Sequence, residues 1–149
     1  MTPEEIILAL PYEPPFLFVD ELTTLSEKYV KGSYTFKEDE YFYSGHFRHH
    51  PVTPGVILIE VMAQIGLVCM GLWMLKDELP EDSKTTIALT SSHVDFFIPI
   101  FPGEKVIIES HREYFRFNKL KCKVSLYNEK QVLACRGMIS GMINTKENA

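Results

Sequence analysis

The sequence predicts an α+β fold in which an antiparallel β-sheet of about six strands wraps around one long central helix. Three observations lead to this architecture. The stretch from Val56 to about Leu75 is apolar on every side, and a helix of that kind must be buried. The segments on both sides of it alternate polar and apolar residues, as half-buried strands do. The length of 149 residues suits a single domain, residues 1–149, with a sizeable core.

The chain begins with a short helix and a pair of strands. A threonine cap, a proline at the first position and two glutamates in the first turn predict a helix over residues 3–9. Residues 16–25 are rich in Phe, Leu and Val, and residues 28–36 alternate in polarity. We therefore expect two strands that form a hairpin joined near Ser26-Glu27.

A long irregular segment, residues 37–52, separates this hairpin from the central helix. It contains aromatic residues and three histidines, and loops of this length in a compact domain are often functional. Thr53 is the predicted N-cap of the helix, and Pro54 follows at a position where a helix tolerates proline. Glu60 and Gln64 are the strong polar interruptions of the first helical turns, and their spacing of four residues places them on one face.

The last third of the chain is expected to consist of strands. Turns at proline, glycine and asparagine residues separate predicted strands over residues 85–98, 104–115, 119–127 and 131–143. An antiparallel sheet of this length buries most of the helix. Because one layer of sheet leaves part of the helix uncovered, we expect a symmetric partner copy to close it.

Composition narrows the classes of function. The net charge of −5 argues against nucleic acid as the main partner. Cys69, Cys122 and Cys135 follow no metal spacing and are odd in number, so we expect them to be reduced core residues. The acidic N-terminus has no basic signal segment, and a lipid-facing Glu60 would be costly. These features favour a cytoplasmic protein that is not inserted in a membrane.

Three groups near the start of the helix form a candidate site. His46 lies in the loop, Glu60 lies in the buried helix, and the N–H of Gly55 lies in the first helical turn, where amides have no internal acceptor. These groups suit chemistry at a carbon beside a carbonyl, because the amide would bind the carbonyl oxygen as negative charge develops. The imidazole would remove the α-proton. The carboxyl, whose protonated form is favoured by burial, would donate a proton to the departing β-hydroxyl.

Each of these groups also has a structural interpretation. A loop histidine is more often a surface or structural residue, a helical glutamate can pair with an arginine, and a Thr-Pro-Gly start can be only a helix cap. Their occurrence within about twenty residues favours a site, because perturbed acids and bases cluster at functional sites. His49 and His50 are expected at the rim of the site, and no metal-ligand pattern lies near them.

The same stretch resembles the β-hydroxyacyl-acyl carrier protein dehydratase family of fatty-acid elongation. That family carries the pattern GHFPGxPxxPGVLxxExMAQ. The matching residues of this chain are Gly45-His46-Phe47, Pro51, Pro54-Gly55-Val56, Glu60 and Met62-Ala63-Gln64. The family's LPHRYPFLLVD opening is similar to residues 10–20, and its FxRPVxPGD segment is similar to residues 96–104. The resemblance covers roughly residues 10–140.

The resemblance implies a hotdog fold and a homodimer, or a trimer of dimers, as the assembly. It implies that His46 is the catalytic histidine and Glu60 the catalytic acid, contributed to each site by two different protomers. Gly55 would polarise the thioester, Val56 would lie beside it in the substrate site, and Gln64 would support Glu60 or a water. The substrate would arrive on the phosphopantetheine arm of acyl carrier protein, and no metal or organic cofactor is expected.

The chain departs from the family pattern at the expected mouth of the site. Arg48-His49 replaces the family's Pro-Gly, and Phe97-Ile98 stands where basic residues are common. Because carrier proteins are acidic, we expect a basic docking surface near the entrance. Its candidate residues are Arg48, Arg112, Arg116, Lys119, Lys121 and Lys123. The three lysines fit a solvated strand face equally well.

Two rival functions stay open from the sequence. Hotdog proteins commonly hydrolyse acyl thioesters, so an acyl thioesterase is the rival enzyme, in which the carboxylate would activate water. A catalytically idle subunit that only binds an acyl chain is the third interpretation. The joint presence of His46 and Glu60 argues against the idle subunit.

Overall fold

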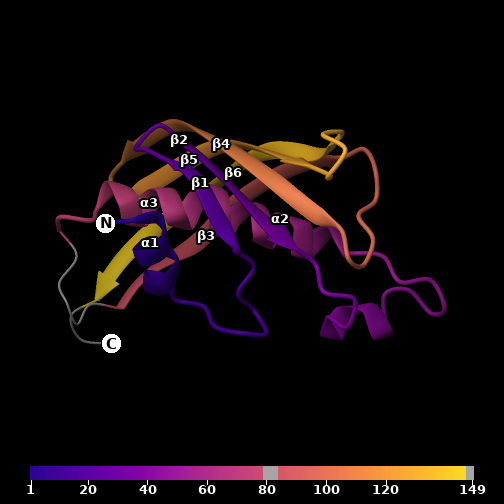
Figure 1. Ribbon diagram of the computed structural model, residues 1–149. Coiled ribbons are helices and arrows are strands. Elements are labelled where there is room, and N and C mark those ends of the chain that lie inside the picture. The colour runs from indigo at the N-terminus through magenta and orange to yellow at the C-terminus, as the bar shows by residue number, and fades with distance from the viewer. Residues whose placement is uncertain (79–83, 147–149) are drawn as a thin grey trace.

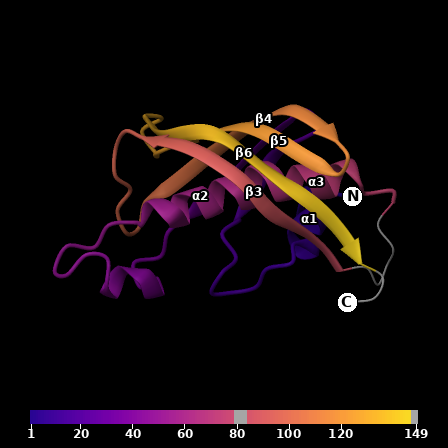
Figure 2. The same ribbon diagram turned by 180° about the vertical axis from the view of Figure 1, so that it is seen from behind.

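The computed structural model describes residues 1–78 and 84–146. Within these residues a six-stranded antiparallel sheet curls around a long helix, as the sequence predicts (Figure 1). The strand order is β1-β2-β4-β5-β6-β3, so β3 lies beside β6 at one edge of the sheet (Figure 2). The strands are β1 Glu21–Leu25, β2 Tyr29–Thr35, β3 Lys84–Phe96, β4 Lys105–Arg116, β5 Lys119–Tyr127 and β6 Leu133–Lys146.

The central helix runs without a break from Gly55 to Met74. It consists of the α-helix α2 (Gly55–Ala63), a π-helical turn η2 (Gln64–Val68) and the α-helix α3 (Cys69–Met74). Its length and mean hydropathy of 2.1 would suit a membrane span, but 72% of the apolar stretch is buried inside the protein itself. The apolar surface of this helix is therefore the core of the domain, as its all-round hydrophobicity predicts.

The start of the helix differs from the prediction in one respect. The N-cap is Pro54, not Thr53, and no side chain caps the helix there. The Thr53 hydroxyl forms a buried hydrogen bond of 2.6 Å with the Tyr43 hydroxyl instead. Local sequence favours capping by a threonine, but here a partner ten residues upstream takes the same oxygen atom.

The N-terminal region also differs from the prediction in part. Helix α1 (Pro3–Ala9) has the predicted bounds and a complete capping box at its start. The following segment, residues 10–19, is here called the strap, because it crosses the central helix instead of opening a strand; β1 begins only at Glu21. The reason lies in its hydrogen bonds. The backbones of Phe16 and Phe18 bond to a side chain of the central helix, not to a neighbouring strand.

The alternation predicted for the fifth strand is confirmed. Every second residue of β5 is fully buried in the core, namely Leu120, Cys122, Val124 and Leu126. All three cysteines are buried and free, as expected. The helix approaches the sheet closely at Gly66, where a Cβ would lie 3.0 Å from the Cβ of Ser110 on β4. The Ser110 hydroxyl donates a 2.8 Å hydrogen bond to the Gly66 carbonyl and so joins the helix to the sheet.

Candidate active site

The loop that carries His46 projects from the end of the molecule at which the central helix begins (Figure 1, purple). A short 3-10 helix, η1 (Tyr41–Ser44), leads into this loop. The half-buried ring of His46 stacks on the ring of Phe47, with 3.9 Å between centroids. The His46 carbonyl accepts a 2.9 Å hydrogen bond from the N–H of Val52, and Nδ1 of His46 lies 2.9 Å from the Val52 carbonyl oxygen. Val52 therefore holds both the backbone and the ring of His46.

The Val52 carbonyl determines which ring nitrogen of His46 carries the proton. A carbonyl oxygen can only accept a hydrogen bond, so Nδ1 must donate one. In the neutral imidazole the free lone pair is then on Nε2, which is the atom left to act as a base.

Glu60 lies half-buried on α2. Burial raises the pKa of its carboxyl, and the 3.0 Å hydrogen bond that it accepts from Gln64 opposes that rise. The carboxyl is therefore easier to protonate than one in water, which is what a general acid near neutral pH needs. Within residues 1–78 and 84–146 the structure shows an ion pair only between Lys31 and Glu109. The structural alternative, a glutamate neutralised by an arginine, is thus not found in the described part of the chain.

Gln64 joins Glu60 to the strap. Its side chain is fully buried. Its Nε2 donates to the Glu60 carboxyl at 3.0 Å and to the Phe16 carbonyl at 2.9 Å, and its Oε1 accepts from the N–H of Phe18 at 2.8 Å. Because both ends of the amide are engaged, Gln64 has one orientation and fixes the Glu60 carboxyl relative to the strap.

Gly55 is the first residue of α2, so its N–H is one of those without an acceptor inside the helix. A Cβ at this position would lie 3.2 Å from the ring of Phe96 on β3, so glycine allows β3 to approach the helix start closely. Val56, the next residue, is 73% exposed although its helix is the core of the domain. The start of the helix therefore presents a free amide and an apolar side chain at the surface of a single chain.

Within one chain the two predicted catalytic side chains belong to separate contact networks. His46 contacts Phe47 and Val52 in its loop, whereas Glu60 contacts Gln64 and, through it, the strap. Three surface pockets, with volumes of about 480, 440 and 280 Å³, are lined by residues other than these two. The contacts of a single chain, over the residues that the structure describes, do not join the imidazole and the carboxyl.

Tyr12 is a neighbour of Glu60 that sequence reasoning did not single out. It lies half-buried on the strap, with its ring centroid 6.4 Å from that of Phe16. Burial, with smaller contributions from Glu60 and Cys69, raises the pKa of Tyr12 to about 12. Its hydroxyl therefore keeps its proton throughout the neutral range. No local sequence signal identifies it, because its position depends on how the strap crosses the helix.

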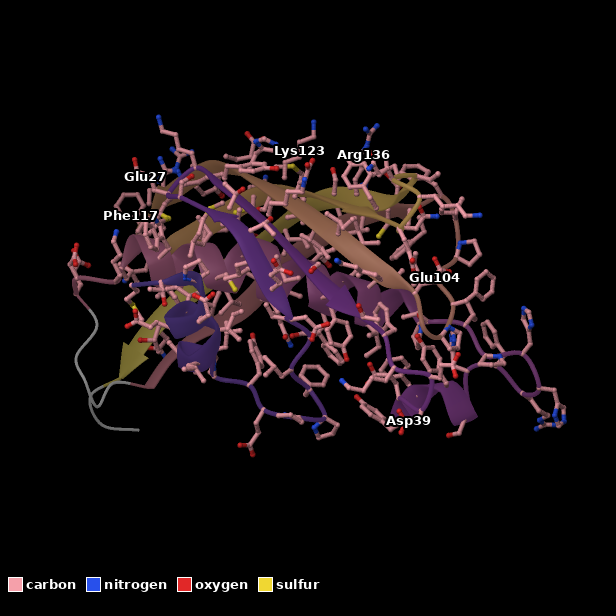
Figure 3. The ribbon with its side chains drawn as sticks, viewed as in Figure 1. Glu27, Asp39, Glu104, Phe117, Lys123 and Arg136 are labelled. Carbon is pink, nitrogen blue, oxygen red and sulfur yellow. The ribbon has the colours of Figure 1, made fainter. Side chains whose placement is uncertain are left out.

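The predicted basic docking residues lie in two separate parts of the chain. Arg48 is exposed in the His46 loop. Arg116 and Lys119 flank Phe117 in the β4–β5 turn, which lies at the far end from Asp39 (Figure 3). The same two strands carry Arg112, Lys121 and Lys123. In one chain these residues therefore form two regions: the loop region at Arg48 and the hairpin region on β4 and β5.

Two side chains near the start of the central helix can exchange protons, namely the imidazole of His46 and the carboxyl of Glu60. His49 and His50 are exposed in the loop, where the rim was expected. In the described ranges no group of three or more His, Cys, Asp or Glu side chains is arranged to hold a metal ion. By their chemistry these two side chains and the Gly55 amide could serve as a base, an acid and an oxyanion donor.

An antiparallel sheet wrapped around one long helix is the hotdog fold, and solved structures agree. The dehydratase heterocomplex ApeI:P from Xenorhabdus doucetiae is similar with a TM-score of 0.79 at 18% identity, over 98% of this chain and 93% of that one. A hypothetical thioesterase with coenzyme A from Streptococcus pneumoniae is similar with a TM-score of 0.60 at 10% identity, over 86% and 88% of the two chains. The protein is a hotdog-fold protein, the class that the sequence predicts.

Sequence comparison identifies the family within this class. The family model described as a FabA-like domain matches residues 10–136. The 3-hydroxyacyl-[acyl-carrier-protein] dehydratase FabZ of Petrotoga mobilis is 32% identical over 142 residues, which cover 95% of this chain and 98% of that protein. The chain belongs to the FabA-like family. The resemblance noted at the helix start is thereby confirmed.

Proposed function

We propose that the protein is a 3-hydroxyacyl-[acyl-carrier-protein] dehydratase, which removes water from 3-hydroxyacyl thioesters and leaves trans-2-enoyl thioesters. Membership of the FabA-like family and the activity named for the Petrotoga relative support the reaction. The observation in the structure that supports it best is the His46 ring, whose Nδ1 is held by Val52 so that Nε2 is free to accept a proton.

The proposed reaction uses three groups. Nε2 of His46 removes the α-proton, and the Gly55 N–H binds the thioester oxygen as enolate charge develops. The electron pair of the broken C–H bond forms the new double bond, while the β-hydroxyl leaves with a proton from Glu60 as water. The raised pKa of Glu60 supports its role as the acid, and Gln64 orients it. Return of the proton from His46 to Glu60 through solvent restores the starting state.

We infer that two copies of the chain share each site. Strand β3 pairs with β6 on one side, and its other side is an edge of the sheet in the described residues. Leu89 and Phe96 on this strand are 49% and 47% exposed, and Val56 beside it at the helix start is 73% exposed. A long edge strand that carries exposed apolar side chains is a template for pairing with a second copy. Such a homodimer, alone or within a trimer of dimers, would bring His46 of one protomer to Glu60 of the other.

The substrate is expected on the phosphopantetheine arm of acyl carrier protein. The acidic surface of a carrier would suit the basic residues at Arg48 and on the β4–β5 hairpin. The proposed proton transfers, C–O cleavage and hydrogen bonds are all assigned to His46, Glu60 and the Gly55 amide, so no metal or organic cofactor is expected. The cytoplasmic location, and the absence of nucleic acid or membrane as a partner, stay predictions.

The test is to incubate the purified protein with a 3-hydroxyacyl thioester loaded on acyl carrier protein. Formation of an enoyl thioester, followed by its ultraviolet absorbance, would support dehydration. Release of free thiol would indicate the rival thioesterase activity, in which Glu60 activates water. Turnover that is unchanged in both His46→Ala and Glu60→Gln proteins would contradict the roles proposed for these residues.

A further inference from the structure

The Tyr43 and Thr53 side chains close the base of the His46 loop. Their hydroxyl oxygens are 2.6 Å apart, and the two residues are only 6% and 4% exposed. Burial raises the pKa of Tyr43 to about 12, so the phenol stays neutral and the pair keeps its hydrogen bond across the working pH range. The N–H of Thr53 also donates a 2.8 Å hydrogen bond to the Ile100 carbonyl, which ties the same residue to the segment between β3 and β4. Thr53 is thus held from two directions.

Thr53 is also the link between the two groups that meet the thioester. On its N-terminal side is Val52, whose carbonyl and N–H hold the ring and backbone of His46. On its other side, one residue beyond Pro54, is the Gly55 amide at the start of α2. A displacement of Thr53 would therefore move the base and the oxyanion donor together.

We propose that the buried Tyr43–Thr53 hydroxyl pair is a positioning element of the active site, which fixes the position of His46 relative to the Gly55 amide. The inference rests on the proposed function, because it takes His46 to be the base. It assigns a purpose to the Thr53 hydroxyl, which does not cap the helix. Positioning is sensitive to small movements, since a misplacement of about 1 Å can cost roughly a hundredfold in rate.

A purely structural role gives a different expectation. Removing one hydroxyl leaves the other buried without a partner, which destabilises the fold whether or not the site is disturbed. Ser26 offers a matched control. Its hydroxyl bonds to the backbone of Lys28 and Tyr29 in the β1–β2 turn, beside Glu27 and far from the Asp39 end of the molecule (Figure 3).

The kinetic experiment uses Tyr43→Phe, Thr53→Val, the double variant, and Thr53→Ser, with Ser26→Ala as the control. We expect Thr53→Val and Tyr43→Phe each to lower kcat by roughly ten- to a hundredfold with KM little changed. The double variant should be no less active than the worse single variant, because the two hydroxyls act as one unit. Thr53→Ser should retain most activity, and Ser26→Ala should lower Tm while leaving kcat unchanged. Single variants with lower Tm but wild-type kcat, or losses that multiply in the double variant, would overturn the proposal.

A second readout does not depend on turnover. The ¹⁵N shifts of the His46 ring nitrogens report how much of the neutral imidazole carries its proton on Nδ1. We expect the Nδ1–H form to predominate in the wild type and to lose population in Thr53→Val, but not in Ser26→Ala. An unchanged tautomer in Thr53→Val would count against the positioning role. If the wild type dehydrates no 3-hydroxyacyl thioester, the proposed function fails, and the tautomer measurement still decides this inference separately.

Discussion

The loop of residues 37–53 and the helix from Gly55 to Met74 each supply one of the proposed catalytic side chains, and they hold it in different ways. Most of the loop is exposed, and His46 is held by hydrogen bonds to Val52. Most of the helix is buried, and Glu60 is held by the helix itself and by the fully buried Gln64. The base thus depends on a few directional contacts, whereas the acid depends on the packed core.

This difference suits the two chemical tasks. A base that must meet a proton on an incoming substrate needs an open approach, and an exposed loop provides it. An acid that must stay protonated near neutral pH needs an environment that disfavours its charged form, and half-burial on a core helix provides that. The comparison also implies that the loop tolerates changes away from its hydrogen bonds, whereas changes along the helix affect stability and chemistry together.

The largest expected effect comes from removing either catalytic group. His46→Ala and Glu60→Gln should each lower kcat by roughly 10²- to 10⁴-fold, the usual contribution of a positioned acid or base. Tm should change little in His46→Ala, because the half-buried His46 side chain is not part of the core. Steady-state kinetics and thermal melts together check both expectations. A His46→Ala protein that loses its fold would show that the His46 side chain is needed for folding and not only for catalysis.

Mixing these two inactive proteins tests whether loop and helix from different copies form one site. Random exchange of subunits makes about half of the dimers mixed, and each mixed dimer has one intact site, so the mixture should regain about a quarter of wild-type activity. The measurement is turnover after mild unfolding and co-refolding of the two variants. A mixture as inactive as its components would mean that each site is built within one chain.

The next effect in size concerns the edge strand β3. Leu89→Lys replaces an exposed apolar side chain of this edge strand with a charge and should dissociate the dimer, with activity falling roughly tenfold or more at low protein concentration. Val132→Lys is the matched control, because Val132 is 47% exposed and Leu89 49%, but Val132 lies outside the sheet. Analytical ultracentrifugation measures the oligomeric state of the two variants, and parallel assays measure their activity. Equal behaviour of the two variants would argue against β3 as the shared interface.

The sequence anticipates the helix better than the loop, for a physical reason. The burial of a helix follows from its own residues, so an all-apolar stretch predicts a core helix without knowledge of which segments pack against it. The π-helical turn within that helix was not anticipated, and neither was the hydroxyl pair of Tyr43 and Thr53. Such features depend on which groups meet in three dimensions. Thr53 is a good cap by local rules, and only the fold brings Tyr43 to compete for its hydroxyl.

The candidate site shows the same limit. His46 and Glu60 could be chosen as candidates from the sequence, because one lies in a long loop and the other interrupts an apolar helix within a recognisable motif. The orientation of Gln64 could not, since its partners Phe16 and Phe18 lie 48 and 46 residues away in the chain. The same holds for Tyr12, whose pKa is influenced by Glu60 only because the strap crosses the helix.

Replacing Gln64 tests how the helix controls its acid, with a smaller effect. The Gln64 hydrogen bond lowers the pKa of Glu60 against the effect of burial, so Gln64→Met should raise that pKa further. The protonated acid would then persist to higher pH, so the alkaline limb of the kcat–pH profile should move to higher pH. The maximal kcat should fall, because the carboxyl is less well oriented. Ser110→Ala is the control, since its hydroxyl bonds to the same helix at Gly66 without touching Glu60. An alkaline limb that moves equally in both variants, or that moves to lower pH in Gln64→Met, would contradict this account.

The smallest expected effect distinguishes the two basic regions. On the proposed function the phosphopantetheine arm has to reach His46, and Arg48 lies on the same loop, whereas the β4–β5 turn next to Lys119 lies at the far end of the molecule from Asp39. Arg48→Glu should therefore raise KM for a carrier-linked substrate by about three- to fivefold, the scale of an exposed ion pair, with kcat unchanged. The KM for a substrate on free pantetheine should not change, and added salt should reduce the difference. The double change Lys119→Glu with Lys121→Glu is the comparison. If the double lysine variant raises the KM for the carrier-linked substrate and Arg48→Glu does not, the carrier docks on the β4–β5 hairpin. The active site that receives the substrate would then contain the His46 loop of another copy of the chain, packed against that hairpin.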